Sequence, residues 1–186
     1  MKKIRGSTEE QYYKLWDYCE ALRECDRNNT AKMQISESEE FSHFERLYVC
    51  LAACKTGWKE GCRPVIGLDG CHVKGPHTGQ LLVAVGIDAE NAMYPIAYAA
   101  VESENRATWK WFLKFLKEDL DIVNDSIVTW ITNKQKGLIG AVKEEFTGSS
   151  HRFCVRHMYN NFKTQFKGLV LKKTLWNAAR ATTKHR

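Results

Sequence analysis

One stretch decides the fold: Gly61-Cys62-Arg63-Pro64-Val65-Ile66-Gly67-Leu68-Asp69-Gly70. It predicts a short buried strand, because its middle residues are apolar on both faces and Pro64, which has no N–H for a sheet, is tolerated at a strand's first residue. The strand delivers one carboxylate, Asp69, to its end. An acidic side chain there is costly unless it is paired, hydrogen-bonded or bound to a cation. Asp69 is therefore the first candidate for a functional residue.

Two further apolar runs follow this strand at short spacing. They cover Gln80–Asp88 and Met93–Val101, and turn-forming residues such as Asp88-Ala89-Glu90-Asn91 separate the runs. Runs of this length joined by tight turns are typical of hairpins. The three strands are expected to form an antiparallel meander.

The rest of the chain alternates between helices and strands. Trp109, Phe112, Leu113, Leu116 and Leu120 share one helical face, Ser126 to Asn133 is a fourth apolar strand, and Leu138 to Phe146 line a second helix. A fifth strand is expected over His151–Val155, followed by helix. The order β-β-β-α-β-α-β-α is the ribonuclease H-like arrangement, an α/β fold with a mixed sheet in which strands 1 and 4 lie parallel and adjacent.

Residues 1–60 are expected to form an N-terminal helical appendage to a domain covering 61–186. Helical spacing of apolar residues predicts an amphipathic helix from Glu9 to about Arg27. The polar segment 31–40 fits a short strand or a linker, and 44–55 fits a strand or a helix.

Charge and composition restrict the partners of this chain. It has 186 residues, a net charge of +6 and seven cysteines without a disulfide-framework spacing, which favours free thiols. No apolar run approaches the roughly 20 residues of a membrane helix, so no membrane partner is expected. His151 to Arg186 contains nine basic and no acidic side chains. This tail suggests a polyanion such as nucleic acid; a solvated helix pair is the alternative.

The ends of strands 1 and 4 define the candidate site. Asp69 ends the first strand and Asn133 follows the fourth, so the two side chains are expected to meet. Enzymes of this fold hold two divalent cations there, and Mg²⁺ prefers carboxylate oxygens. Asn133 is neutral, and no acidic residue follows Glu145. Asp69 is then a ligand in a working site, a retained but idle ligand position, or an ordinary turn residue, and Asn133 can also be explained as a helix cap.

Two acids and three lysines near these strand ends are secondary candidates. Glu102 and Glu104 could lean towards the site as accessory acids, or could simply be favourable charges before a helix. Lys74, Lys134 and Lys136 follow strands 1 and 4 and could contact DNA phosphates, or could be solvated surface residues.

Cys154 and His157 form a Cys-x-x-His pair. They supply two of the four ligands of a structural zinc site, and Cys62, Cys71, His72 and His151 are the residues that could complete it. A buried cysteine beside a surface histidine explains the pair equally well.

Three blocks resemble the plant Mutator-like element (MULE, MuDR-type) transposases. The stretch from Gly61 to Gly75 resembles their first catalytic block, and Thr132-Asn133-Lys134-Gln135-Lys136-Gly137-Leu138-Ile139 their second, where an Asp normally stands at Asn133. His151-Arg152-Phe153-Cys154-Val155-Arg156-His157 resembles their Cys-x-x-His block. Trp109-Lys110-Trp111-Phe112 is similar to the family's helix between strands 3 and 4.

The resemblance implies a DDE catalytic core descended from DNA cut-and-paste enzymes. It implies Mg²⁺ as the ancestral cofactor, DNA as the partner, with Arg152 and Arg156 among the contact residues, and the nucleus as the compartment. The second acid is substituted here, and the third is expected beyond the end of this chain. We therefore expect an inactive core with weak, sequence-tolerant DNA binding; a domesticated transcriptional regulatory or protein-interaction module is the alternative.

Overall fold

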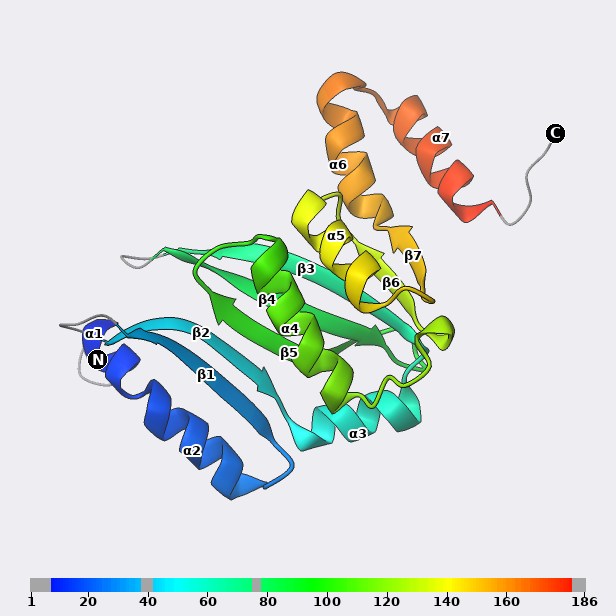
Figure 1. The fold of residues 1–186 in the computed structure, drawn as a ribbon. Coiled ribbons are helices and arrows are strands. Elements are labelled where there is room, and N and C mark those ends of the chain that lie inside the picture. The colour runs from blue at the N-terminus through cyan, green and yellow to red at the C-terminus, as the bar shows by residue number, and fades with distance from the viewer. Residues whose placement is uncertain (1–7, 38–41, 75–77, 182–186) are drawn as a thin grey trace, which may run out of the picture.

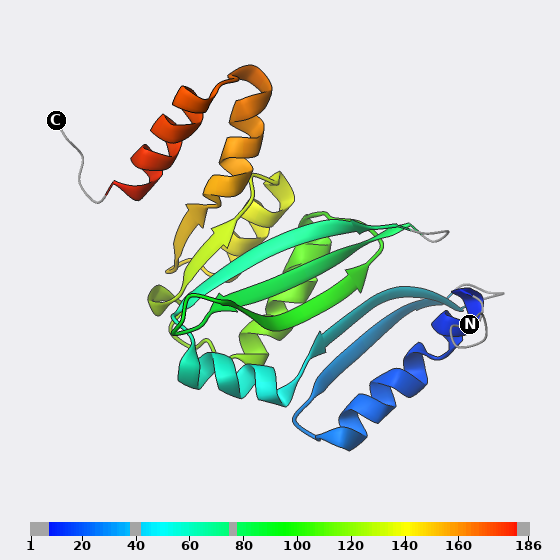
Figure 2. The same cartoon turned by 180° about the vertical axis from the view of Figure 1, so that it is seen from behind.

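A computed structural model describes residues 8–37, 42–74 and 78–181 of the chain. Its centre is one mixed sheet of seven strands in the order β1-β2-β5-β4-β3-β6-β7 (Figure 1). Helices α4 and α5 cover one face of the central strands, and the view from behind shows α2 against the β1–β2 part of the other face (Figure 2). The layers and the mixed sheet confirm an α/β fold compatible with the ribonuclease H-like arrangement.

The secondary structure follows the predicted order from residue 65 onward. The strands are β1 (Thr30–Glu37), β2 (Ser42–Cys50), β3 (Val65–Val73), β4 (Gly79–Ile87), β5 (Met93–Val101), β6 (Thr129–Thr132) and β7 (Ser150–Phe153). The helices are α1 (Thr8–Tyr13), α2 (Leu15–Cys25), α3 (Ala52–Gly61), α4 (Arg106–Asp119), α5 (Lys136–Glu145), α6 (Val155–Gln165) and α7 (Leu169–Arg180), with a short 3₁₀ turn at Asp125–Ile127.

The meander and the parallel crossover are both present. Strand β4 pairs antiparallel with β3 and with β5, while β6 pairs parallel with β3, with Leu68 opposite Thr132. Strand β7 continues the parallel pairing on the outer side of β6. The expected neighbour relation of strands 1 and 4 is therefore confirmed, and it brings the ends of β3 and β6 together.

Helix α4 carries the centre of the core. Asn105 caps its first turn by accepting from the N–H groups of Ala107 and Thr108, and the Thr108 hydroxyl accepts from the Asn105 N–H in return. The predicted apolar face is buried against the sheet: Trp109, Phe112, Leu113, Leu116 and Leu120. Trp130 of β6 stacks on Phe146 with ring centroids 4.3 Å apart. This core fixes β3 and β6, the two strands that carry the candidate site.

The segment before Gly61 is only partly helical, which corrects the expected helical appendage. Strands β1 and β2 pair antiparallel as a hairpin that joins the sheet, because β2 pairs with β5 through Leu47 opposite Ala100 and Val49 opposite Tyr98. Alternate residues of the hairpin bury apolar side chains against α2, where Cys19 is fully buried. The amphipathic helix predicted up to Arg27 ends at Cys25 and is broken near Lys14.

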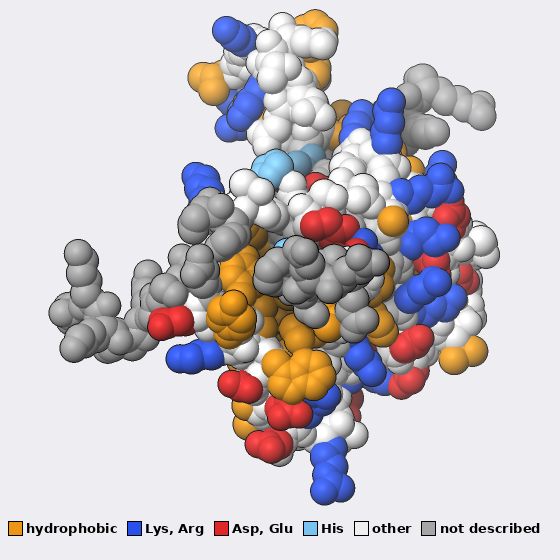
Figure 3. Space-filling model, turned by 60° about the vertical axis from the view of Figure 1, so that its left-hand side comes forward, with side chains coloured by type: hydrophobic (Ala, Val, Ile, Leu, Met, Phe, Trp, Pro, Cys, Tyr) orange, Lys and Arg blue, Asp and Glu red, His pale blue; other side chains and the backbone are white. Residues whose placement is uncertain are grey.

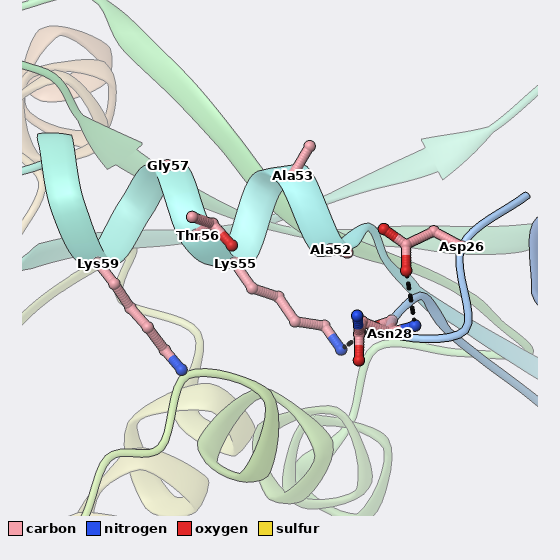
Figure 4. A pocket seen from close by; sticks show the side chains of 8 residues that line it. All are labelled: Asp26, Asn28, Ala52, Ala53, Lys55, Thr56, Gly57 and Lys59. Atoms are coloured by element: carbon pink, nitrogen blue, oxygen red, sulfur yellow. Dashed lines mark hydrogen bonds between the residues drawn. The ribbon is translucent and has the colours of Figure 1, made fainter.

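One polar cluster joins this hairpin to the core, and we name it the Asp119 cluster. The Asp119 carboxylate, at the end of α4, accepts hydrogen bonds from Thr30 Oγ1 (2.7 Å) and Tyr48 OH (2.9 Å) and pairs with Lys55 Nζ (2.8 Å). Lys55 reaches from α3 to the carbonyl of Asn28 as well (Figure 4). Three segments of the chain, β1, β2 and α3, are thus tied to a single carboxylate on α4.

None of the described helices is both long enough and apolar enough to cross a membrane.

Candidate functional site

Asp69 lies where β3 loses its parallel neighbour. Strand β3 does not end at Asp69, as the sequence suggested, but continues to Val73, because β4 keeps pairing with it as far as Val73 opposite Gly79. Strand β6 ends at Thr132, opposite Leu68. Asp69 is therefore the first β3 residue without a partner on that side, and the chain that leaves β6 passes directly beside it.

The Asp69 carboxylate faces hydrogen-bond donors of the protein. Asn133 Nδ2 donates to Asp69 Oδ1 (3.2 Å), and the N–H of Gly70 donates to the same oxygen (3.0 Å). His157 Nε2 lies 3.5 Å from Asp69 Oδ2. The predicted meeting of Asp69 and Asn133 is thus present, and a histidine completes the group.

Local backbone contacts fix the orientation of the Asn133 amide. The N–H of Gln135 donates to Asn133 Oδ1 (2.9 Å), so the NH₂ group is turned towards Asp69. Asn133 is not the cap of α5, because Gln135 holds that position and accepts from the N–H of Leu138. The helix-cap explanation of Asn133 is therefore wrong, and its amide serves Asp69 instead.

His157 reaches Asp69 because α6 begins directly after β7. The N–H of Cys154 donates to the carbonyl of Thr132 (2.8 Å), which holds the start of α6 beside the end of β6. The zinc prediction gains no ligands, since no group of three or more His, Cys, Asp or Glu side chains is gathered anywhere in the described ranges. The His157 ring instead faces the carboxylate of Asp69.

The two accessory acids have different surroundings. Glu102 is bound by Arg46, whose Nε and Nη2 both donate to its carboxylate (2.9 and 2.7 Å), so it points to the β2 side of the sheet. Glu104 lies against Gly70, where a Cβ atom would meet its carboxyl carbon at 2.9 Å, and it accepts from Trp109 Nε1 (3.1 Å). Only Glu104 is therefore near Asp69 in space, and the absence of a side chain at Gly70 makes room for it.

Four of the predicted basic residues lie on the segments that carry the site, and Lys74 lies beyond the end of β3. Lys134 and Lys136 follow β6, and Arg152 and Arg156 lie on β7 and α6; all four are exposed. Lys134 Nζ lies 5.9 Å from the centre of the Phe153 ring. Lys74 is exposed but five residues beyond Asp69, roughly 16 Å along an extended strand, so it is not beside the carboxylate.

His151 takes part in the site's support, a role that its sequence pattern did not reveal. Its Nε2 lies 2.7 Å from Thr132 Oγ1, and that hydroxyl donates to the carbonyl of Asn133 (2.8 Å). Burial lowers the pKa of His151, and the nearby charges of Lys143 and Arg152 lower it further. A neutral imidazole at this position holds the turn between β6 and α5 through the Thr132 hydroxyl.

A surface hollow lies away from this site. It has a volume of about 600 Å³ and runs along α3 between Asp26 and Lys59 (Figure 4). Lys55 is used by the Asp119 cluster and Lys59 pairs with Asp121, so its cations are already engaged. The hollow follows from the packing of α3 and is open to solvent.

Fold and site together define a class of protein. A mixed sheet with a strand-borne aspartate beside the end of its parallel neighbour is the framework of the nucleases and transposases that cut DNA with metal ions. A family model, the MULE transposase domain, matches residues 65–161. The chain belongs to this family, the Mutator-like transposases. No curated protein sequence matches it.

Proposed function

We propose that this chain is a degenerate DDE transposase core that no longer cleaves DNA. One observation carries the proposal: both oxygens of the Asp69 carboxylate lie against nitrogen atoms of the protein, Oδ1 against Asn133 Nδ2 (3.2 Å) and Oδ2 against His157 Nε2 (3.5 Å). The family match supports descent from a transposase. The groups that lie against Asp69 argue against a retained cleavage activity.

The residues around Asp69 do not fit a pair of divalent cations. Membership of the family implies that the ancestral activity used a divalent metal. Such a pair needs several carboxylate oxygens to balance its charge. Asp69 lies against the amide NH₂ of Asn133, and Glu102 is bound by Arg46. Of the two accessory acids, Glu104 is the one placed near Asp69, beside Gly70. Two carboxylates with an amide and an imidazole leave about half of that charge unbalanced.

A plasmid-nicking assay tests the loss of cleavage. We expect supercoiled plasmid to stay intact with Mg²⁺ or Mn²⁺ at any protein concentration, and the Asp69→Ala variant to behave in the same way. Nicking by the unaltered chain that disappears in Asp69→Ala would overturn the proposal, because it would require a working site at Asp69.

We further propose that DNA remains a weak partner that is bound without regard to sequence. Four exposed cations lie on the chain segments that hold Asn133 and His157, namely Lys134, Lys136, Arg152 and Arg156, and the chain carries no acidic residue after Glu145. Phosphate contacts of this kind release counterions, so affinity falls steeply with salt and depends little on base sequence.

A mobility-shift series at rising salt tests this second proposal. The double variant Arg152→Ala/Arg156→Ala is expected to weaken binding to unrelated duplexes alike and to reduce the slope of log K against log[salt] by about 2. Lys114→Ala, which removes an exposed cation on α4, is the matched control and should change little. Binding that persists at high salt or prefers one sequence would contradict the proposal.

A domesticated regulatory or protein-interaction module is the second candidate function. The observation in its favour is that the core does not depend on the altered site, because buried Trp109, Trp130 and the Asp119 cluster hold it together. We propose the nucleus as the compartment of the transposase core, since its partner is DNA, and the same compartment for a transcriptional regulatory module. A chain that shows no affinity for duplexes in the salt series, but folds stably, would favour the module.

A further inference from the structure

Helices α6 and α7 form a hairpin that projects from the sheet and lacks a partner. Neither helix, both within the described part of the chain, contains a fully buried residue, and α7 packs mainly on α6 (Figures 1 and 2). Isolated helices of this length are marginal in water, so a tertiary or quaternary contact is needed to hold them.

The tip of this hairpin combines apolar and cationic side chains; we name it the basic tip, and its residues are Phe166, Lys167, Leu169, Val170 and Lys173. Gly168 has a φ of +124°, which allows the chain to reverse there. Leu169 and Val170 are 75% and 76% exposed. Lys163 and Lys172 lie over the Tyr159 ring, whereas Lys167 and Lys173 make no ion pair or ring contact with the residues that the structure describes.

A surface of opposite charge lies on α1 and α2; we name it the acidic stripe, and its residues are Tyr13, Trp16, Glu20 and Glu24. Trp16, Glu20 and Glu24 follow one another at four-residue steps, so they share one face of α2. This face is turned away from Cys19 and Leu22, which pack on the hairpin β1–β2. Trp16 is 54% exposed, and no ion pair of Glu20 or Glu24 is found within the described ranges.

The two surfaces lie at opposite ends of the molecule and cannot meet within one copy. In Figure 3 blue and orange side chains gather on the projecting hairpin at the top, and several red side chains lie beside orange ones at the lower end of the molecule, where α2 lies and where blue side chains are interspersed. A symmetric contact between two basic tips would bring like charges together, whereas a tip placed on a stripe pairs Lys167 and Lys173 with Glu20 and Glu24 and covers apolar side chains on both sides.

We propose that the basic tip of one copy binds the acidic stripe of a second copy, head to tail. Such a heterologous contact closes into a ring or continues as an open chain of copies. The small area of a helix turn on a helix face fits a weak association, with a dissociation constant of about 10–100 µM.

Sedimentation velocity of the full chain without DNA tests this proposal. The average mass is expected to rise with protein concentration at low salt, and the association to weaken several-fold between about 0.05 M and about 0.5 M NaCl, where charges a Debye length apart are screened. A single monomeric species at all concentrations would overturn it.

Charge-reversal substitutions on the acidic stripe and on the basic tip test whether these two surfaces form the contact. Glu20→Lys/Glu24→Lys and Lys167→Glu/Lys173→Glu are each expected to weaken self-association at least about tenfold, because each leaves tip and stripe with the same sign of charge. Mixing these two variants restores opposite charges at both contacts, and so does one chain with all four changes, so association should return in both. Failure of the mixture to associate would contradict the head-to-tail arrangement.

A matched control separates the stripe from net charge. Glu60→Lys/Glu90→Lys changes the charge by the same amount at two exposed acids outside both surfaces, and it should leave self-association unchanged. An equal loss in this control would show that net repulsion alone governs association, and would overturn the assignment of the stripe. Circular dichroism of each variant checks that the changes, all at exposed positions, leave the fold intact.

Discussion

Replacing Asp119 with alanine is expected to lower the free energy of unfolding by about 3 kcal/mol, a large fraction of a domain's stability. The carboxylate is 10% exposed and its partner Lys55 16% exposed, so the ion pair is largely shielded from water. Its loss leaves the Lys55 ammonium and the hydroxyls of Thr30 and Tyr48 without their acceptor. An unpaired buried charge costs more than the pair itself contributes.

The pKa values of neighbouring groups show how little water reaches this cluster. Burial raises the pKa of Tyr48 far above its ordinary value, and the adjacent Cys50 and Asp119 raise it further. Burial, with Asp119 as the next cause, raises the pKa of the Cys50 thiol to about 12. Both groups therefore stay neutral, and the Asp119 carboxylate has Lys55 as its counter-charge.

Urea unfolding measures the effect of this change, with two comparison variants. Asp119→Asn keeps an acceptor oxygen and should lose less stability than Asp119→Ala. Asp121→Asn, two residues further on, removes the charge of an exposed ion pair with Lys59 and keeps a residue type that tolerates its positive φ of 49°, so little change is expected. Equal losses of stability in the Asp119 and Asp121 variants would contradict the role of Asp119 in joining the N-terminal hairpin to the core.

A double-mutant cycle isolates the pair itself. Lys55→Met combined with Asp119→Ala should lose less than the sum of the single changes, because the second change no longer strands a charge. A strictly additive result would mean that Lys55 and Asp119 act independently.

The sequence predicted the central strands because their apolar runs are local signals. An apolar pattern is visible within each of these segments alone: Val65 to Leu68, the runs of β4 and β5, and the Trp109 face of α4. The order of the segments then predicted the parallel pairing of β3 and β6. For the N-terminal hairpin the sequence allows a strand in each segment but does not predict their pairing, for a different reason. Ala31, Met33 and Ile35 do alternate, but Lys32 and Gln34 between them resemble a linker, and the pairing with β5 joins residues about fifty positions apart.

The candidate site was predicted in part. The sequence predicts that Asp69 and Asn133 lie close together, because neighbouring parallel strands end at the same edge of a sheet. The spacing of His157 to Cys154 allows either a zinc ligand or a surface histidine beside a buried cysteine. The sequence holds no signal that α6 starts close enough to place the His157 ring beside Asp69. Asp119 gave no signal either, because an acidic residue in the last turn of an amphipathic helix is usually solvated, and its partners lie 64 to 89 residues away.

Changing Asn133 to aspartate is expected to create a cation site in which Asp69 and the new side chain each supply a carboxylate. The new carboxylate would replace the NH₂ group that lies 3.2 Å from Asp69 Oδ1, so two negative groups would face each other with Glu104 close to Gly70. Without metal, their repulsion raises the pKa of one carboxyl above its unfolded value of about 3.9. Stability is then retained below pH 4 and lost as the pH rises through the raised pKa, by about 1 kcal/mol after allowance for solvent exposure.

Divalent cations should reverse this loss in the variant alone. A cation at a hundred times its dissociation constant stabilises the folded state by about 2.7 kcal/mol, which corresponds to roughly 5–10 °C in Tm for a chain of this size. Thermal unfolding at pH 7.5 with EDTA, Mg²⁺ or Mn²⁺ measures both effects. The unaltered chain, whose Asp69 faces an amide and an imidazole, is expected to show little shift, and adding Asp69→Asn to the variant should abolish the gain. Equal Mn²⁺ shifts in the unaltered chain and the Asn133→Asp variant would mean that Asn133 is not what excludes the cation, and that the site is closer to its ancestral state than its donors suggest.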